Sequence, residues 1–262
     1  MLCVFDCESI PDTQLLRKIY GYEGDDLEIC EQAFKAQEEL SGSSFLPHAF
    51  HKIISIAALI ADESGNMIKI GCFEEGGGEK AILSSFLQYL NTKQPRLVSF
   101  NGRGFDIPTI LLRAMQYNLN AEAYFETTNP TLKKDKWENY RQRYSERFHL
   151  DLFDVLGHYG AATKGLRLNV LANMCGLPGK YDIYGDEVYR LYFENQQERI
   201  DTYCQSDVLN TYWVYLKYQL LSGVIQLSHY RKCLESMGEK IPQDKEYADI
   251  FLEAIQAEIQ AI

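Results

Sequence analysis

The hydrophobic and polar residues of this chain alternate between two periods, one typical of strands and one typical of helices. Five short apolar runs predict strands at residues 2–6, 53–60, 67–73, 96–100 and 148–150. The first run has no polar face, as expected for a strand buried on both sides. The segment Asp62-Glu-Ser-Gly65 indicates a hairpin turn between the second and third strands.

Apolar residues at helical spacing dominate the rest of the chain. They predict helices over residues 79–90, 106–118, 151–158, 168–174, 186–193, 199–221, 226–238 and 245–260. Residues 12–42 are polar and acidic with the same spacing, and they predict a helical insertion. This order predicts an α/β fold, a mixed five-stranded sheet flanked by helices. We expect residues 1–221 to form one domain and residues 222–262 a C-terminal helical extension packed on it.

Two carboxylates stand at the end of the first apolar run. Asp6 and Glu8 are two residues apart, so in a pleated strand they point to the same side and can reach one ion. The pair is weak evidence by itself, because 37 acids in 262 residues give about five such pairs by chance. An exposed strand end with solvated acids is the alternative interpretation.

Two later segments place further carboxylates near a strand end and on a helix. Asp106 follows the turn Asn101-Gly-Arg-Gly104, at the start of a predicted helix, where it could equally be an ordinary N-cap. Asp207 lies four residues after Tyr203, so the two share a helix face. A surface Tyr–Asp pair is the alternative there. Carboxylates that converge from distant segments favour Mg²⁺ or Mn²⁺, and ion pairs of this kind cut phosphodiesters.

Taken together and in this order, the three motifs carry a specific signal. Asp6-Cys-Glu8, Asn101-Gly-Arg-Gly-Phe-Asp106 and Tyr203-Cys-Gln-Ser-Asp207 resemble the motifs of the DEDD superfamily of 3′–5′ exonucleases, in its tyrosine subtype. More narrowly, the chain is similar to bacterial predicted 3′–5′ exonucleases related to the proofreading domain of family B DNA polymerases. The resemblance covers about residues 1–221, and it implies a ribonuclease H-like fold.

The resemblance also implies the chemistry and the role of each motif residue. Asp6, Glu8, Asp106 and Asp207 would hold two Mg²⁺ or Mn²⁺ ions, and Tyr203 would orient the attacking water. The implied reaction is hydrolysis of 3′-terminal phosphodiesters of single-stranded DNA to nucleoside 5′-monophosphates, in a DNA repair setting. Two alternatives stay open: a 3′–5′ exoribonuclease of the same superfamily, and a non-catalytic adaptor that binds nucleic acid or a polymerase.

Candidate nucleic-acid contacts lie next to the motifs and in two basic segments. By the same resemblance, Ser9 and Ile10 would touch the terminal nucleotide and Asn101 the sugar-phosphate. Lys164 and Arg167 form one short basic segment. A longer segment interleaves cations with aromatic residues, which can grip a single strand or be a solvated face; it contains Lys133, Lys134, Lys136, Trp137, Tyr140, Arg141, Arg143, Tyr144 and Arg147.

Composition limits the setting in which such an enzyme would act. The net charge of −11 argues against tight, processive binding of long duplex by this chain alone, and leaves room for a polymerase or processivity partner. The seven cysteines are scattered without a C-x-x-C pair, which favours reduced thiols in the cytoplasm. We expect no membrane span, because no run approaches ~18 apolar residues, and no export signal.

A few other residues have chemistry that the sequence leaves ambiguous. His48 and His51 have workable spacing for a metal, but a loop before the second strand is the favoured interpretation. Asp151 and Asp154 could add a fifth acid, although helix capping is the preferred interpretation of Asp151.

Overall fold

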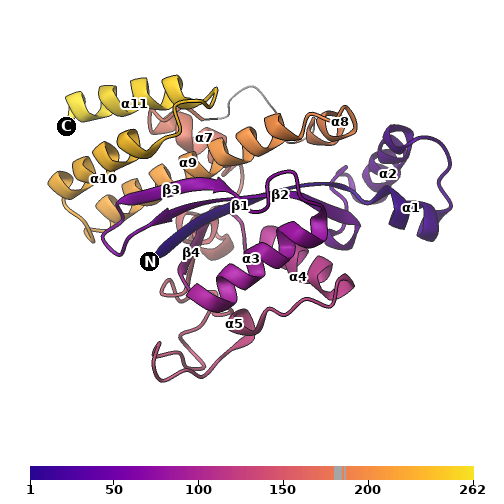
Figure 1. Ribbon diagram of the computed structural model, residues 1–262, viewed down its shortest axis with the longest axis horizontal. Coiled ribbons are helices and arrows are strands. Elements are labelled where there is room, and N and C mark those ends of the chain that lie inside the picture. The colour runs from indigo at the N-terminus through magenta and orange to yellow at the C-terminus, as the bar shows by residue number, and fades with distance from the viewer. Residues whose placement is uncertain (180–184, 186) are drawn as a thin grey trace.

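A mixed sheet of five strands forms the middle layer of the protein (Figure 1). The computed structural model describes residues 1–179, 185 and 187–262. The strands lie in the order β3-β2-β1-β4-β5, with β1 antiparallel to β2 and parallel to β4. Their bounds are β1 Leu2–Pro11, β2 His51–Ala61, β3 Met67–Cys72, β4 Arg96–Ser99 and β5 His149–Asp151. The predicted α/β fold, a mixed five-stranded sheet flanked by helices, is confirmed.

Helices cover both faces of the sheet. Figure 1 shows α3 and α4 on one side and the long α9 with α10 and α11 on the other. The helices are α1 Thr13–Tyr20, α2 Asp26–Ser41, α3 Glu79–Lys93, α4 Asp106–Gln116, α5 Glu122–Phe125, α6 Leu152–Leu156, α7 Leu168–Met174, α8 Val188–Phe193, α9 Gln197–Leu221, α10 Leu227–Lys240 and α11 Ala248–Ala261. The predicted helix 186–193 begins at a residue outside the described ones, and the predicted helix 151–158 ends at Leu156.

The first strand is longer than its apolar run predicts. The prediction ended it at residue 6, whereas β1 continues to Pro11 because β2 pairs with it along its whole length, Leu2 opposite Ala61 and Pro11 opposite His51. On its other edge β1 pairs with β4 only at residues 2–4. Asp6 and Glu8 therefore lie within the strand, beside an edge that β4 does not cover.

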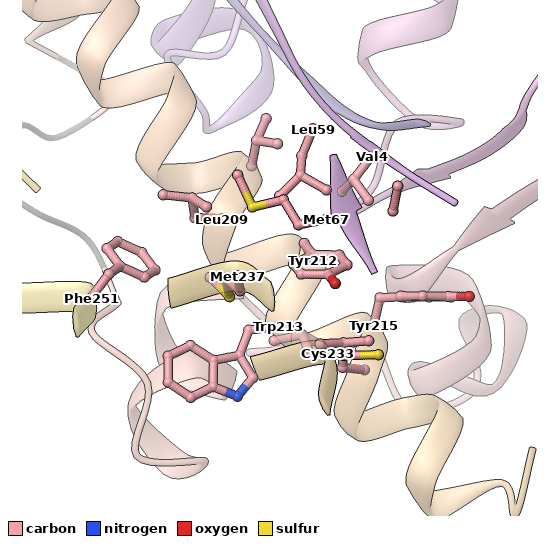
Figure 2. Packing of buried hydrophobic residues seen from close by; sticks show 14 of the residues in the cluster. Val4, Leu59, Met67, Leu209, Tyr212, Trp213, Tyr215, Cys233, Met237 and Phe251 are labelled. Atoms are coloured by element: carbon pink, nitrogen blue, oxygen red, sulfur yellow. The ribbon is translucent and has the colours of Figure 1, made fainter. Parts of the chain in front are cut away.

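The third-motif helix is buried on all sides. Every residue of α9 from Ile200 to Leu216 is buried, because the sheet covers one side and other helices cover the rest. Figure 2 shows Tyr212 and Trp213 among side chains of the sheet and of α10 and α11. Polar residues of α9 find partners inside: Gln205 Oε1 accepts a hydrogen bond of 2.7 Å from the Tyr247 hydroxyl.

The segments before and after the central layers form helices as expected, with some differences. The insertion of residues 12–42 contains two helices, α1 and α2, at one end of the molecule (Figure 1). Asp12 caps α1 and Asp25 forms a capping box on α2. At the C-terminus, α10 and α11 join the same apolar cluster as α9. The division into residues 1–221 and 222–262 stays a prediction.

Two further sequence-based expectations concern the environment of the protein. No described helix combines the length and the apolar character that crossing a membrane requires. All seven cysteines lie in the described part of the chain and are free thiols.

One buried ion network ties the end of β1 to α3 and α4. Arg113 of α4, only 4% exposed, donates to Glu79 at 2.6 Å and to Asp12 at 2.7 Å. The same Glu79 carboxylate accepts the backbone N–H of Ile53 at 2.8 Å. Two buried acids thus take their counter-charge from one guanidinium, which is the arrangement that makes such burial tolerable.

Replacing Arg113 with methionine should destabilise the protein strongly. Arg113→Met leaves two buried carboxylates without their cation, so we expect the free energy of unfolding in urea to fall by roughly 3–5 kcal/mol. The control is Arg17→Met, because the Arg17–Asp26 pair has side chains 38% and 45% exposed and should contribute under about 1 kcal/mol. Equal losses in the two variants would contradict the proposed importance of burial.

Candidate active site

The turn after β4 brings Asp106 to the part of β1 that β4 does not pair with. Because β4 ends at Ser99, the chain turns through Asn101 and enters α4 at Asp106, whose carboxylate accepts the backbone N–H of Cys7 at 2.9 Å. The turn requires glycine at position 102, where a Cβ atom would lie 2.4 Å from the Ser99 hydroxyl. The alternative interpretation of Asp106 as the N-cap of α4 is wrong, because Phe105 occupies the N-cap position and Asp106 is the first residue of the helix.

A second group of ligand atoms gathers where α9 crosses β1. One ligand atom each from Asp6, Glu8 and Cys204 lie within 4.8 Å of one another. The Cys204 thiol is also 3.5 Å from the backbone oxygen of Asp6. Cys204 was not among the predicted site residues. Its position directly after Tyr203 is the only signal that could have suggested it.

The four predicted carboxylates act on one another electrostatically. Burial, and then the negative charges of Asp106, Glu8 and Asp207, raise the pKa of the Asp6 carboxyl well above its ordinary value. Burial raises the pKa of Asp106 to about 6, against the opposing effect of its hydrogen bonds with Cys7. Segments about 100 residues apart in the chain thus meet in one acidic cluster.

Tyr203 lies beside this cluster with its ring buried. Burial raises the pKa of its phenol above the ordinary value of 10.0, and so do the charges of Glu8, Asp207 and Asp6 and a hydrogen bond to Asp207. Tyr203 is therefore a neutral phenol near pH 7. A carboxylate accepts and does not donate, so the hydroxyl hydrogen points to Asp207.

The donor set fits hard divalent cations. Carboxylate oxygens from Asp6, Glu8, Asp106 and Asp207 are the ligands that Mg²⁺ and Mn²⁺ prefer. The raised pKa of Asp6 means that its charged form is disfavoured in the metal-free protein, which a bound cation would reverse. The nearby thiol of Cys204 is a softer donor, and it is not needed for such a site.

A cavity of about 650 Å³ lies along the edge of β1 beside Glu8, the one of the four carboxylates that is among its described lining residues. Its wall combines residues of β1 with aromatic rings from other parts of the chain: Cys7, Glu8, Ser9, Pro11, Phe34, Phe45, His51, Phe105 and Tyr189. Arg190 also borders it. The aromatic members were not predicted. Phe45 follows a Gly-Ser-Ser sequence, a loop signal that could have drawn attention to it, and its side chain is 54% exposed.

The predicted nucleic-acid contacts lie in different places. Ser9 lines the cavity, whereas the Ile10 side chain is buried in a cluster with Tyr203. Asn101 has a positive φ of 67° and donates its backbone N–H to Asp151 at 2.7 Å. Lys164 and Arg167 are exposed in the segment before α7, and they are not among the described residues that line the cavity.

Part of the basic and aromatic segment is structural. Lys134 is buried and pairs with Glu126 at 2.8 Å, while the buried Tyr140 donates to the backbone oxygen of Pro95 at 2.6 Å. Neither side chain is accessible to a nucleic acid. Trp137 and Tyr144 of the same segment remain exposed.

The ambiguous acids and histidines also have structural partners. Asp151 caps α6 by accepting the backbone N–H of Phe153, which confirms the preferred interpretation. Asp154 forms an ion pair with Arg143. His48 contacts the backbone oxygen of Gly104 and His51 that of Leu46. Among the described residues, the groups with metal-ligand geometry include neither histidine.

Replacing Asp106 with asparagine should stabilise the metal-free protein at neutral pH. An acid whose pKa rises on folding contributes stability that is lost as the pH rises through its folded value, here about 6. The rise from 3.8 to about 6 corresponds to up to about 3 kcal/mol at 1.36 kcal/mol for each pKa unit. The amide oxygen of the introduced asparagine would still accept the Cys7 N–H.

Thermal melting in EDTA at pH 5 and pH 7.5 measures this effect. The Asp106→Asn variant should melt above the wild type at pH 7.5, and the difference should shrink at pH 5, where Asp106 is protonated. Addition of Mg²⁺ should raise the melting temperature of the wild type more than that of the variant. A variant that melts lower than the wild type at both pH values in EDTA would refute a raised pKa of Asp106 in the folded protein.

Comparison with known proteins identifies the family. A sequence model described as "Predicted 3'-5' exonuclease related to the exonuclease domain of PolB" matches residues 43–255, a span that leaves out Asp6 and Glu8. A DNA polymerase of Archaeoglobus fulgidus is 23% identical over 143 residues, which are 53% of this chain and 17% of the polymerase. The structure of the family B DNA polymerase from Pyrobaculum calidifontis aligns with 97% of this chain and with 26% of the polymerase chain, at 14% identity and a TM-score of 0.49.

This chain spans only a minor part of the length of either polymerase. It belongs to the family of predicted 3′–5′ exonucleases related to the exonuclease domain of family B DNA polymerases.

Proposed function

We propose that this chain removes nucleotides from the 3′ end of single-stranded DNA and releases nucleoside 5′-monophosphates. The observation that carries the proposal is the acidic cluster around Asp6, on which Asp106, Glu8 and Asp207 act from three separate segments. Membership of an exonuclease family supports the reaction class. The substrate and the metal dependence are our proposal.

In this proposal the four carboxylates hold two Mg²⁺ or Mn²⁺ ions. Such ions, when bound, supply an activated water and stabilise the leaving 3′-oxygen. The chain's own part is to hold the carboxylates at fixed positions. Asp6 is fixed by the pairing of β1 with β2, Asp106 by its hydrogen bond to Cys7, and Asp207 by the buried helix α9.

Tyr203 would orient the attacking water. Its hydroxyl hydrogen is given to Asp207, so the oxygen offers lone pairs that can accept a hydrogen bond from a water. With a pKa raised above 10.0, the phenol does not remove a proton at neutral pH. Orientation, not general base catalysis, is the role that this environment supports.

The cavity beside Glu8 favours an unpaired strand. Nucleobases stack on aromatic rings when they are free of their partners, and Phe45, Phe105 and Tyr189 line this cavity. The net charge of −11 disfavours a long phosphate track, so the enzyme should release its substrate after few cleavages. A ribonucleotide strand offers the same stacking, and the test below separates the two.

The direct test compares 5′-labelled single-stranded DNA, RNA of the same sequence and a mismatched duplex, each with Mg²⁺ and with Mn²⁺. The proposal requires shortening of the DNA from its 3′ end, abolished by EDTA, with mononucleotide products. Preferential digestion of RNA would redirect the assignment to an exoribonuclease. A protein that binds strands but cuts none, and whose melting temperature ignores the metals, would be an adaptor.

Replacing Asp207 with asparagine should abolish hydrolysis while the protein stays folded. The matched control is Asp201→Asn, because Asp201 lies on the same helix with the same 7% exposure but bonds to Ser55 at 2.6 Å. We expect the control to retain turnover, because Asp201 is not among the charges that act on Asp6. Measurable turnover in Asp207→Asn at saturating Mg²⁺ would remove Asp207 from the proposed ligand set.

The Tyr203→Phe variant should be slowed, not inactivated. It loses the hydrogen bond to the attacking water, a neutral bond worth roughly 0.5–1.5 kcal/mol, so the rate should fall on the order of tenfold. Tyr212→Phe is the control, because Tyr212 is buried on the same helix and bonds to the Gly65 backbone oxygen away from the carboxylates. If Tyr203→Phe were as inactive as Asp207→Asn, or changed the shape of the pH–rate profile, the orienting role would be wrong.

A further inference from the structure

His51 uses both of its ring nitrogens in hydrogen bonds beside the cavity. Nδ1 lies 3.0 Å from the Ser9 hydroxyl, and Nε2 lies 3.0 Å from the backbone oxygen of Leu46. The ring is only 8% exposed and packs against Phe45 and Phe105 with centroids 5.1 Å away from each. Burial lowers the pKa of His51 to about 4, which agrees with a neutral imidazole at pH 7.

These partners fix the direction of each hydrogen bond. A backbone oxygen can only accept, so Nε2 carries the hydrogen of the neutral ring. Nδ1 is then an acceptor, and the Ser9 hydroxyl must donate its single hydrogen to it. The Ser9 oxygen is left with lone pairs. Because Ser9 is half-buried and lines the cavity, any group that it meets there must be a donor.

The position of Ser9 indicates which donor that is. Ser9 directly follows Glu8 on β1, with Cα atoms about 3.8 Å apart, and both line the same cavity. If the phosphate to be cut lies at the carboxylates, the sugar of the same terminal nucleotide lies one step along the strand. The hydroxyl of that sugar is a donor, whereas a phosphate is only an acceptor.

We infer that His51 is a positioning residue that turns the Ser9 hydroxyl into an acceptor for a hydroxyl of the terminal sugar. This inference rests on the proposed exonuclease function and deepens it. The arrangement selects ends that carry a free hydroxyl and disfavours ends that carry a phosphate. The 3′-hydroxyl of DNA and the 2′-hydroxyl of a terminal ribonucleotide share this chemistry, and separate substrates distinguish them.

The experiment measures the first cleavage in single-turnover reactions. Four oligonucleotides identical except at the last sugar are compared: a 3′-hydroxyl, a 3′-hydrogen, a 3′-phosphate and a single terminal ribonucleotide. The wild type should prefer the 3′-hydroxyl to the 3′-hydrogen end by roughly tenfold. A preference carried by the ribonucleotide end instead would assign the contact to the 2′-hydroxyl.

The variants separate the acceptor from the residue that positions it. Ser9→Ala should bring the rates on 3′-hydroxyl and 3′-hydrogen ends together. His51→Gln keeps an amide near the Leu46 oxygen but has no acceptor at the Nδ1 position, so the Ser9 hydroxyl is free to donate. Its discrimination against the 3′-phosphate end should weaken by roughly tenfold. His51→Asn places an amide oxygen near the Nδ1 position and should restore that discrimination.

A second serine–histidine pair supplies the matched control. The Ser99 hydroxyl lies 2.8 Å from His149 Nε2, and neither residue is among the described residues that line the cavity. Ser99→Ala should lower the melting temperature and leave the end preference as in the wild type. Unchanged end preference in Ser9→Ala, with normal cleavage by the wild type, overturns this inference alone. A folded, metal-supplied wild type that cuts none of the four oligonucleotides overturns the proposed function as well.

Discussion

The unequal pairing of β1 on its two edges is the constraint on which the site depends. β2 accompanies β1 to its end, whereas β4 leaves it after residue 4. A buried backbone N–H beyond that point needs another acceptor, and the Asp106 carboxylate supplies one to Cys7. The same hydrogen bond holds Asp106 next to Asp6. The sheet therefore creates the place where carboxylates from separate segments meet.

Buried acids in this protein lie in two different electrostatic environments. Glu79 and Asp12 take their positive charge from Arg113 within the chain. The neighbouring charges that act on Asp6 are those of Asp106, Glu8 and Asp207, all negative. Burying like charges together is unfavourable unless a cation joins them. That difference is the physical basis for proposing metal ions at the second cluster and none at the first.

The helices on the α9 side determine how accurately the cluster is held. Since α9 is buried from Ile200 to Leu216, Tyr203 and Asp207 cannot shift without disturbing contacts on both sides of the helix. The C-terminal helices α10 and α11 contribute the outer contacts (Figure 2). The helices α10 and α11 thus support the geometry of the carboxylates through their contacts with α9. Rigid elements of this kind suit a site whose ligands must stay in place when charged.

The sequence by itself determined the features that depend on local spacing. Residues two apart on a strand share a side and residues four apart on a helix share a face, so Asp6 with Glu8 and Tyr203 with Asp207 were predictable. The type of nearly every element followed from its period. The order of the motifs was sufficient to predict the family that the comparison confirmed.

Only the tertiary structure decided the contacts between distant segments. The length of β1 depends on its pairing with β2, and the link from Cys7 to Asp106 spans 99 residues. Lys134 looked like a nucleic-acid contact but is buried against Glu126, and His51 looked like a loop residue but bonds to Ser9. The hydrophobic period of a segment indicates which side of its own helix or strand a residue faces. It carries no information on which polar group of another element will meet that residue, because that depends on how the layers pack.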